Sequence, residues 1–305
     1  MKKLSLIPML VVVLLLLSCA SQQKEGEEQG WVSITFYHTS DIHEHAAPVP
    51  RIAKFVESRK KNDPNVLFVD TGDWFNKGDL TKLNTRGEAI VAMLSACKYD
   101  ALIPGNHDYS FGTQRLAELI DQFSLPIVAA NCIWPEDIKP EYAIPYRIFE
   151  LEGVNVAIIG TATPITLQQV DSLLEILPID ESIRDIVAML EERVDIIVLL
   201  THVGVWDDKE LAQSLPGVDI IFGGHDHVSF REVLIANGTD IIIQHSGYYG
   251  QHIGELTVVW DGEEFVERKL RLVEVTDELP ESNSVARIWK KYLSQATKPA
   301  PVSSQ

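Results

Sequence analysis

The stretch ALIPGNHDYSFG, residues 101–112, joins a short apolar run to a cluster of polar and ionisable side chains. Residues 101–104 have the composition of a strand that is buried on both faces. The glycine and asparagine that follow suit a turn, but the imidazole and carboxylate at 107–108 are not needed for one. The meaning of the cluster therefore depends on whether other strands of the chain end in the same way.

Four other apolar runs also end in side chains that can bind a metal ion. The five clusters are HTSDIHEH at 38–45, DTGD at 70–73, GNHD at 105–108, TH at 201–202 and GGHDH at 223–227. In open α/β sheets, ligands gather at the carboxyl ends of the strands. We therefore expect these clusters, which are far apart in the sequence, to converge in space.

Strand-like and helix-like segments alternate around these clusters, which is typical of an α/β fold. Short β-branched apolar runs predict strands at 34–37, 66–69, 102–103, 126–129, 156–159, 196–200 and 219–222. Apolar residues at helical spacing predict helices at 51–61, 86–97, 114–123 and 181–194. Further strands are predicted at 241–244, 256–260 and 265–275, the last two joined by the turn signal Asp261-Gly262. We therefore expect two sheets packed together.

The residue types in the clusters favour a transition-metal site. Mixed imidazole and carboxylate ligands suit Mn, Fe or Zn better than Ca. In Asp41-x-His43 and His225-x-His227, the spacing of two lets both side chains of an extended segment point the same way. Two ions about 3.5–4 Å apart can hold the attacking and leaving oxygens of a phosphoryl displacement. Asp73 is the natural candidate for a carboxylate that bridges such a pair.

The clusters contain five motifs in the order D-x-H, G-D, G-N-H-[DE], H and G-G-H-x-H. This set and its order resemble the motifs of the calcineurin-like metallophosphoesterase family. A narrower resemblance is to the N-terminal catalytic domain of the 5′-nucleotidase, UDP-sugar hydrolase and 2′,3′-cyclic phosphodiesterase group. The segments that carry it are HTSDIHEH, DTGD, GNHDYSFG, AAN, THVG and GGHDH. The resemblance covers about residues 34–275. It implies a metal-dependent phosphoric ester hydrolase with a four-layer α/β/β/α sandwich of two mixed sheets flanked by helices.

The resemblance also implies a role for each matching residue. The implied ligands are Asp41, His43 and His227 for one divalent ion, Asn106, His202 and His225 for a second, and Asp73 as the bridge. Mn, Zn or Fe are the ions to expect. A metal-bridging hydroxide would attack phosphorus in line, and His107 would stabilise the phosphoryl oxygens or protonate the leaving group.

Other residues near the motifs are candidates for supporting roles. The expected hydrogen-bond partners that orient the metal ligands are His45, Asp108 and Asp226. The candidates for the walls of the substrate cleft are Trp74, Trp206 and His245. For each of them the alternative is a purely structural role.

Two features depart from the nucleotidase pattern. Nucleotidases of this group commonly carry an aspartate three residues after the catalytic histidine, whereas this chain has Ser110. Without that carboxylate, the pKa of His107 should fall and its orientation should loosen, unless Asp108 or another acid replaces it. The sequence also ends about where the C-terminal nucleotide-binding domain would begin, so we expect the usual nucleoside pocket to be missing.

The N-terminal residues predict export. Two lysines precede an apolar stretch at 4–17, which suits the h-region of a signal peptide better than a membrane span. LLSC at 16–19 is similar to a bacterial lipobox, which implies lipidation of Cys19; a plain signal peptide is the alternative. We expect a signal peptide at 1–18, a flexible tether at 19–30, a catalytic domain at 31–278, and a C-terminal helix with a Pro/Ser tail at 279–305. The protein would then be lipid-anchored in the bacterial cell envelope, on the periplasmic face or the cell surface.

Composition excludes some partners and leaves the substrate open. With a net charge of −18 and no basic cluster, the chain has no electrostatic reason to bind a nucleic-acid polymer, and we expect no such binding. The expected activity is hydrolysis of phosphomonoesters or diesters, with a nucleotide, a cyclic nucleotide or a related small phosphoester as substrate. The alternative is a metal-binding accessory lipoprotein with little turnover that depends on a partner for substrate binding. Cys97 and Cys132 are too few for a disulfide framework, although an exported protein could join them in one bridge.

Overall fold

The computed structural model describes residues 30–163, 173–236 and 238–296. From Trp31 onward the described residues form one compact unit. The expected signal peptide at 1–18, the lipidation site Cys19, nearly all of the tether at 19–30 and the end of the tail lie outside the described residues. Each helix that the structure describes is too short or too polar to cross a membrane.

The first of two central sheets has seven strands. They are β1 (Val32–Thr39), β2 (Val66–Asp70), β3 (Ala101–Leu102), β4 (Ile127–Val128), β6 (Ala143–Ile144), β14 (His252–Trp260) and β15 (Phe265–Glu274). They lie in the order β15-β14-β1-β2-β3-β4-β6. The strands from β1 to β6 pair in parallel, and the hairpin of β14 and β15 adds two antiparallel strands at one edge.

The second sheet has six strands. They are β7 (Tyr146–Leu151), β8 (Val154–Gly160), β10 (Ile196–Leu200), β11 (Ile220–Gly223), β12 (Ser229–Ala236) and β13 (Thr239–Ser246). They lie in the order β12-β13-β11-β10-β8-β7, with a parallel centre and antiparallel edges at β7 and β12. A separate ladder joins β5 (Cys132–Ile133) to β9 (Glu175–Ile176). Cys132 and Cys97 are both free thiols, so the bridge between them is not formed.

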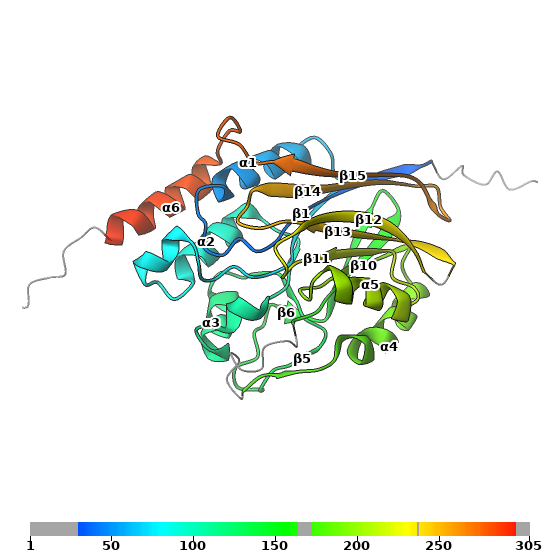
Figure 1. Cartoon of the computed structure of the whole chain (residues 1–305), viewed down its shortest axis with the longest axis horizontal. Coiled ribbons are helices and arrows are strands. Elements are labelled where there is room, and N and C mark those ends of the chain that lie inside the picture. Colours follow the sequence, from blue (N-terminus) through cyan, green and yellow to red (C-terminus); the bar gives the residue numbers. More distant parts are fainter. Residues whose placement is uncertain (1–29, 164–172, 237, 297–305) are drawn as a thin grey trace, which may run out of the picture. The chain divides into compact units, whose positions relative to one another are not determined.

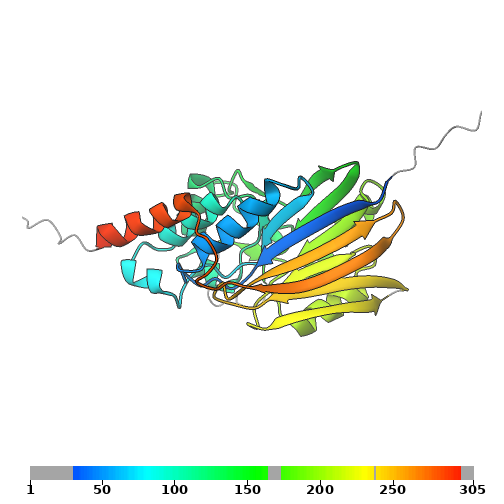
Figure 2. The ribbon, with the colours of Figure 1, turned by 90° about the horizontal axis from the view of Figure 1, so that it is seen from above.

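Helices cover the outer faces of both sheets. The helices are α1 (Val49–Lys60), α2 (Glu88–Cys97), α3 (Thr113–Gln122), α4 (Ile179–Glu191), α5 (Val205–Ser214) and α6 (Asn283–Ala296), with short 3-10 turns η1 (Asp79–Leu83) and η2 (Asn106–Tyr109). α1 packs on β2, and α6 packs on α1 and α2; α4 and α5 pack on β10 and β11 (Figures 1 and 2). The layers are therefore helices, sheet, sheet and helices, which confirms the predicted four-layer sandwich.

The core between the sheets explains why the central strands are apolar without interruption. In β10, Ile196, Val198 and Leu200 pack between the two sheets. Ile197 and Leu199 point the other way and pack with residues of α4 and α5. Because successive side chains of a strand face opposite sides, a strand covered on both faces needs apolar residues at every position.

The ends of the central strands from both sheets meet at one place. The hydroxyl of Thr71, directly after β2, donates to the carbonyl of Gly223 at the end of β11, at 3.2 Å. The backbone amide of Asp41, just beyond β1, donates to the carbonyl of Gly72 at 2.9 Å. His202, just beyond β10, contacts the carbonyl of Thr71 through its Nδ1, at 2.6 Å. The loops that carry the polar clusters therefore converge, as the sequence predicts.

We expect Phe36→Ala to lower the free energy of unfolding by about 3–5 kcal/mol. Phe36 of β1 is fully buried, and its ring centroid lies 5.7 Å from that of Phe222 on β11, where the two sheets meet. Urea denaturation of both proteins measures the difference. Val233→Ala on the edge strand β12 is the control, because that side chain is 39% exposed. A change below about 0.5 kcal/mol is expected for the control, and an equally small change for Phe36→Ala would contradict its place in the core.

Candidate metal centre

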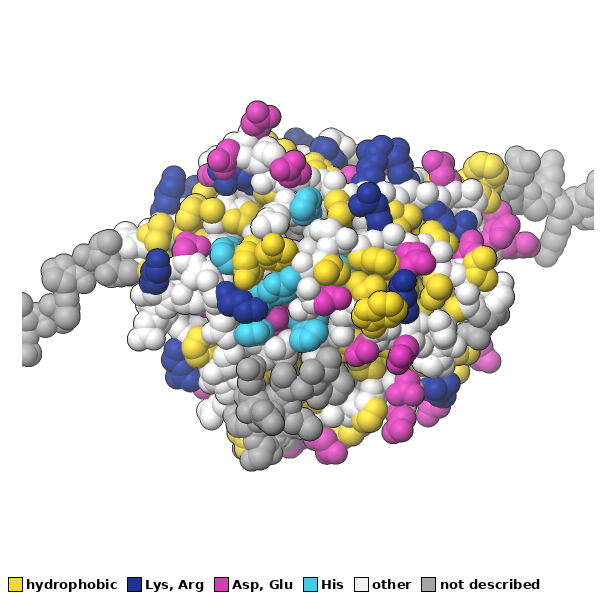
Figure 3. Space-filling model, viewed as in Figure 1, with side chains coloured by type: hydrophobic (Ala, Val, Ile, Leu, Met, Phe, Trp, Pro, Cys, Tyr) yellow, Lys and Arg dark blue, Asp and Glu magenta, His cyan; other side chains and the backbone are white. Residues whose placement is uncertain are grey.

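The seven predicted ligands come together from five loops, and most of them are buried. Asp41, His43 and His202 are 0% exposed, Asp73 is 1% exposed and Asn106 is 5% exposed. His225 and His227 are partly exposed and lie on the outer side of the group. Figure 3 shows several histidine side chains gathered in one area of the molecular face. The structure thus places an imidazole-rich and carboxylate-rich cluster where the strands end.

Three of the predicted ligands form the first half of this cluster. The Nε2 atoms of His43 and His227 are 3.0 Å apart. Oδ1 of Asp41 lies 3.3 Å from Nε2 of His227 and 3.8 Å from Nε2 of His43. The three side chains therefore direct their ligand atoms at a common point, as a cation between them would require.

The second half lies beside the first, and Asp73 stands between them. Nδ1 of His225 is 3.0 Å from Oδ1 of Asn106. Oδ2 of Asp73 is 3.2 Å from Nε2 of His202 and 3.4 Å from Nε2 of His43. One carboxylate oxygen thus reaches a ligand of each half, which is the position of a bridging ligand.

Unpaired buried atoms show that this donor set fits metal ions. Oδ1 of Asp41 and Nε2 of His202 are buried and have no hydrogen-bond partner. The opposite ring nitrogens are occupied, because Nδ1 of His43 contacts the carbonyl of Phe75 at 2.8 Å and Nδ1 of His202 contacts that of Thr71 at 2.6 Å. A carbonyl can only accept, so Nδ1 of each ring carries a proton and Nε2 is the ring nitrogen that faces the cluster.

The protonation of the cluster leads to the same conclusion. Burial opposes ionisation of Asp41 and Asp73, but the facing imidazole of His202 and the other partners of these groups together outweigh it and lower the pKa of both carboxyl groups. Although burial acts against it, these carboxylates raise the pKa of His202 to about 10. Burial lowers the pKa of His43 to about 4, which keeps that ring neutral and able to bind a metal ion. A divalent ion would take the place of the proton that the carboxylates otherwise hold at His202.

The backbone of the cluster is unusually strained. Asp41, His43, Asp73, His225 and His227 all have positive φ, at 53°, 49°, 63°, 90° and 57°. Non-glycine residues rarely adopt this left-handed conformation, and each instance costs on the order of 1–3 kcal/mol. Strain of this kind persists only where the surrounding structure imposes it, and it gathers at functional sites.

Asp108 holds two of the ligand loops together. Its carboxylate accepts hydrogen bonds from the backbone amides of Gly105 at 2.7 Å, Asp73 at 2.9 Å, Trp74 at 2.7 Å and Phe75 at 3.2 Å. Gly105 itself must be glycine, because a Cβ atom there would overlap the Asp73 side chain. Asp108 therefore orients Asp73 through its backbone, and within the described residues its hydrogen bonds go to backbone amides rather than to a ligand side chain.

Two of the three predicted cleft residues are buried, and those predictions are wrong. Trp74 is 0% exposed and donates its indole N–H to Asp70 at 2.6 Å. His245 is 1% exposed and lies between Asp208, at 2.7 Å, and Asp226, at 3.5 Å. Neither side chain can line a cleft. Trp206, at the start of α5, is 80% exposed, and its contact with substrate stays a prediction.

The other two supporting residues act differently from the expectation. The His45 ring stacks on Tyr249, with centroids 4.0 Å apart, and its buried Nε2 has no hydrogen-bond partner. It forms no hydrogen bond to a predicted ligand within the described residues. Asp226 accepts a hydrogen bond from the backbone amide of Val205 at 3.0 Å and pairs with His245. Asp226 thus anchors the turn that carries the predicted ligands His225 and His227, and it does not orient a ligand side chain directly.

An amide, not a carboxylate, supports His107. Nδ2 of Asn76 lies 3.2 Å from Nδ1 of His107 and 2.6 Å from Oγ of Ser110. The Ser110 hydroxyl donates in turn to the carbonyl of His107, at 2.5 Å. Burial is the largest of the effects that lower the pKa of His107. Asp108 is engaged with backbone amides, so it does not replace the aspartate that the nucleotidase pattern leads one to expect at position 110.

Sequence reasoning missed several residues that surround the cluster. Besides Asn76, the ammonium of Lys77 lies 3.2 Å from Nε2 of His43. Tyr248 stacks on His227 with ring centroids 5.0 Å apart. The signal available in the sequence was proximity, since Asn76 and Lys77 follow Asp73 within four residues and Tyr248 follows the cleft candidate His245 by three.

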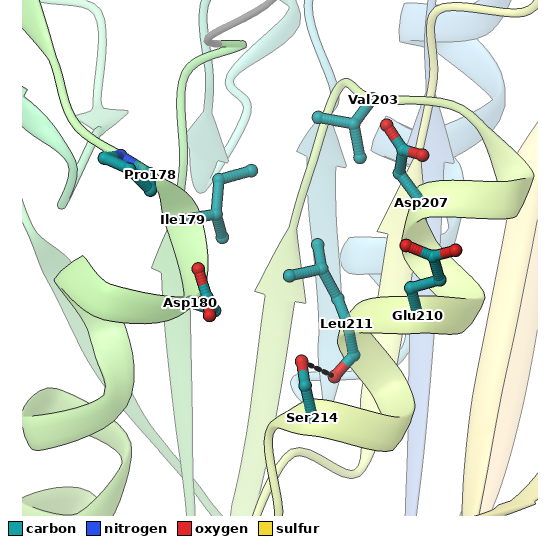
Figure 4. Close-up of a pocket in the computed structure, with 8 residues that line it drawn as sticks. All are labelled: Pro178, Ile179, Asp180, Val203, Asp207, Glu210, Leu211 and Ser214. Atoms are coloured by element: carbon teal, nitrogen blue, oxygen red, sulfur yellow. Dashed lines mark hydrogen bonds between the residues drawn. The ribbon is translucent and has the colours of Figure 1, made fainter.

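A separate surface cavity of about 420 Å³ does not suit an anionic ligand. It lies between the start of α4 and one face of α5, and Figure 4 shows Leu211 between the two helices. Asp180, Asp207 and Glu210 line it, and no basic residue does. Three carboxylates would repel a phosphate group, so the histidine-rich cluster is the better candidate for phosphate chemistry.

Comparison with known proteins agrees with this geometry. Residues 34–229 match the family described as calcineurin-like phosphoesterase. YunD, an uncharacterised metallophosphoesterase of Bacillus subtilis (strain 168), is 28% identical over 240 residues, covering 74% of this chain and 50% of that protein. A snake venom 5′-nucleotidase from Gloydius brevicauda is 25% identical over 300 residues, covering 83% of this chain and 49% of that protein. The chain therefore spans about half the length of these two relatives.

A solved structure shows the same fold. The crystal structure of a 5′-nucleotidase precursor from Thermus thermophilus matches with a TM-score of 0.78 and 27% identity. The match covers 87% of this chain and 59% of that one. The likeness therefore extends over most of the present chain and over part of the longer structure.

We expect Asp73→Asn to retain fewer metal ions than the unaltered protein. The amide loses the negative charge that faces His43 and His202, so affinity for divalent ions should fall on the order of 10–100-fold. Equilibrium dialysis against Mn²⁺ followed by metal analysis measures the number of ions bound per chain. Asp207→Asn, in the acidic cavity, is the control and should bind as many ions as the unaltered protein. Equal metal content in Asp73→Asn would contradict its bridging position.

Proposed function

Because the chain belongs to the calcineurin-like phosphoesterase family, we propose that it is a hydrolase of small phosphoesters that works with two divalent metal ions. The observation that carries the proposal is the position of the Asp73 carboxylate between His43 and His202, beside buried ligand atoms that lack partners. A cluster of this kind is costly to bury unless cations neutralise it.

The seven proposed ligands are assigned to two metal ions. Asp41, His43 and His227 would hold one ion, Asn106, His202 and His225 the other, and Asp73 both. When bound, the two ions supply a nucleophilic hydroxide near neutral pH and polarise the phosphoryl oxygens. The carbonyls of Phe75 and Thr71 accept from Nδ1 of His43 and His202, and this turns the Nε2 atoms of both rings toward the cluster.

His107 is placed to contact the reacting phosphoryl group. One of its ring nitrogens lies within 4.8 Å of ligand atoms of His43 and Asp73. The amide of Asn76 can only donate through Nδ2, so Nδ1 of His107 accepts and Nε2 carries the proton of the neutral ring. That proton can be donated to a phosphoryl oxygen or to the leaving oxygen.

The relatives suggest the class of substrate. The Gloydius brevicauda and Thermus thermophilus proteins are described as 5′-nucleotidases. We propose by analogy that a nucleotide, a cyclic nucleotide or a related small phosphoester is the substrate. The lipobox-like LLSC at 16–19 supports a second proposal, that acylated Cys19 anchors the protein in the bacterial cell envelope.

The full chain loaded with Mn²⁺ should hydrolyse at least one member of a panel of an aryl phosphomonoester, an aryl phosphodiester and nucleotides. Chelation should abolish the activity, and Asp73→Asn should lower kcat on the order of 100-fold or more. Asp207→Asn should match the unaltered protein. Bound metal without hydrolysis of any substrate would instead favour an accessory, metal-binding role that depends on a partner.

Ser110→Asp should increase turnover of substrates with poor leaving groups. A carboxylate at position 110 would lie beside the contact between Asn76 and His107 and would favour the protonated imidazole that donates to the leaving oxygen. We expect kcat for an alkyl phosphate to rise on the order of 10-fold, with a smaller change for an aryl phosphate. Ser110→Asn matches the size without the charge and serves as the control. Unchanged turnover of the alkyl phosphate in Ser110→Asp would refute the idea.

A further inference from the structure

The loop that follows Asp73 contains a strained turn centred on a lysine. Asn76 and Lys77 both have φ of 69°, in the left-handed region. The backbone amide of Gly78 donates to the carbonyl of Asn76 at 2.9 Å, which closes a three-residue turn around Lys77. A turn of this kind with positive φ at its centre is rare and strained, and glycine would suit the position better. A lysine there therefore calls for a functional reason.

The turn is held firmly against the segment that carries two metal ligands. The backbone amide of Asn76 donates to the carboxylate of Glu44 at 2.8 Å. Gly78 packs so closely on Glu44 that a Cβ atom would overlap its backbone. Glu44 itself directly follows His43 and donates its amide to the carbonyl of Trp74 at 2.6 Å. The direction in which Lys77 leaves the turn is thus set by the loops of the metal cluster.

The Lys77 side chain reaches the metal cluster without a carboxylate partner. Its ammonium lies 3.2 Å from Nε2 of His43. No described lysine or arginine besides Lys77 hydrogen-bonds to a predicted ligand, and Lys77 forms no ion pair with a described carboxylate. Burial is the largest effect on the pKa values of His43 and His107, and the positive charge of Lys77 is a smaller one that also lowers both. One cation therefore stands near both the ligand and the residue that would contact the phosphoryl group.

A metal ion and the ammonium cannot share the lone pair of His43. Lys77 is exposed to solvent, so its head group is free to turn away from the ring when an ion is bound. It would then lie at the rim of the cluster, on the side from which an anion approaches. The chain carries a net charge of −18, which repels anionic substrates at a distance. A local cation at this rim would attract the anionic group of a substrate and offset that repulsion.

We propose that Lys77 binds the non-bridging oxygens of the substrate phosphoryl group and makes the site prefer phosphomonoester dianions to phosphodiester monoanions. The proposal rests on the proposed function, because it assumes that the phosphoryl group sits at the metal cluster. Coulomb energy scales with the product of the charges, so a dianion gains about twice as much from Lys77 as a monoanion at the same distance. A diester also replaces one charged oxygen with an ester group that cannot pair with the ammonium.

The test compares Lys77→Gly and Lys77→Arg with the unaltered full chain, each loaded with Mn²⁺. Glycine removes the ammonium and suits the left-handed turn, so folding is not at risk. Loss of a charged hydrogen bond should raise KM for an aryl phosphomonoester about 10-fold, whereas KM for an aryl phosphodiester should change by less than about 3-fold. Lys77→Arg should restore most of the monoester affinity. Lys82→Ala is the control, because Lys82 is an exposed lysine in the neighbouring turn η1.

A binding measurement separates this proposal from the proposed function. Calorimetric titration of the Mn²⁺-loaded proteins with inorganic phosphate at pH 8 should show about 10-fold weaker binding to Lys77→Gly, with metal content unchanged. That result would support Lys77 as an anion contact even if no ester were hydrolysed. Equal phosphate affinity, an equal change for monoester and diester, or a loss of bound metal in Lys77→Gly would each overturn the proposal.

Discussion

The buried carboxylates of Asp41 and Asp73 impose the constraint on which the rest of the site depends. Two negative charges away from water are costly unless cations or hydrogen-bond donors face them. Here the imidazoles of His43, His202 and His227 face them, but Oδ1 of Asp41 and Nε2 of His202 have no hydrogen-bond partner. The left-handed ligand residues, the close glycine contacts and the fixed histidine tautomers all serve to hold this charged group together. The protein thus accepts local strain in order to keep an arrangement that cations complete.

The central part of the fold could be predicted because burial on both faces leaves a strong pattern. Strands such as β8, β10 and β11 are continuous apolar runs, and their helices repeat apolar residues at helical spacing. The edge strands β7 and β12 and helix α5 were missed. In β12, exposed and partly buried residues alternate, and α5 buries few residues and carries Asp207 and Asp208 in its first turn. Such segments take their conformation from neighbours rather than from their own composition.

The candidate site, like the fold, could be predicted from the sequence only in part. The motifs gave the ligand candidates, because metal-binding residue types at strand ends converge by topology alone. Trp74 and His245 were misplaced, since the residue type and its place in the sequence do not show whether a side chain is buried or exposed. Asn76 and Lys77 were missed because their positions depend on a left-handed turn that ordinary residue preferences disfavour. His245 shows what a buried histidine can do instead: it fills a space between Asp208 and Asp226 and so supports the turn at 225–227.

The carboxylate of Asp108 has a consequence for how the two halves of the cluster relate. It accepts hydrogen bonds from the loop of Asp73 and from Gly105, which precedes Asn106. The proposed bridging ligand Asp73 and the proposed ligand Asn106 are therefore tied to a single anchor. The hydrogen bonds of Asp108 thus fix the separation of the two halves through the polypeptide itself, which would leave the second half shaped for its ion when the first is filled.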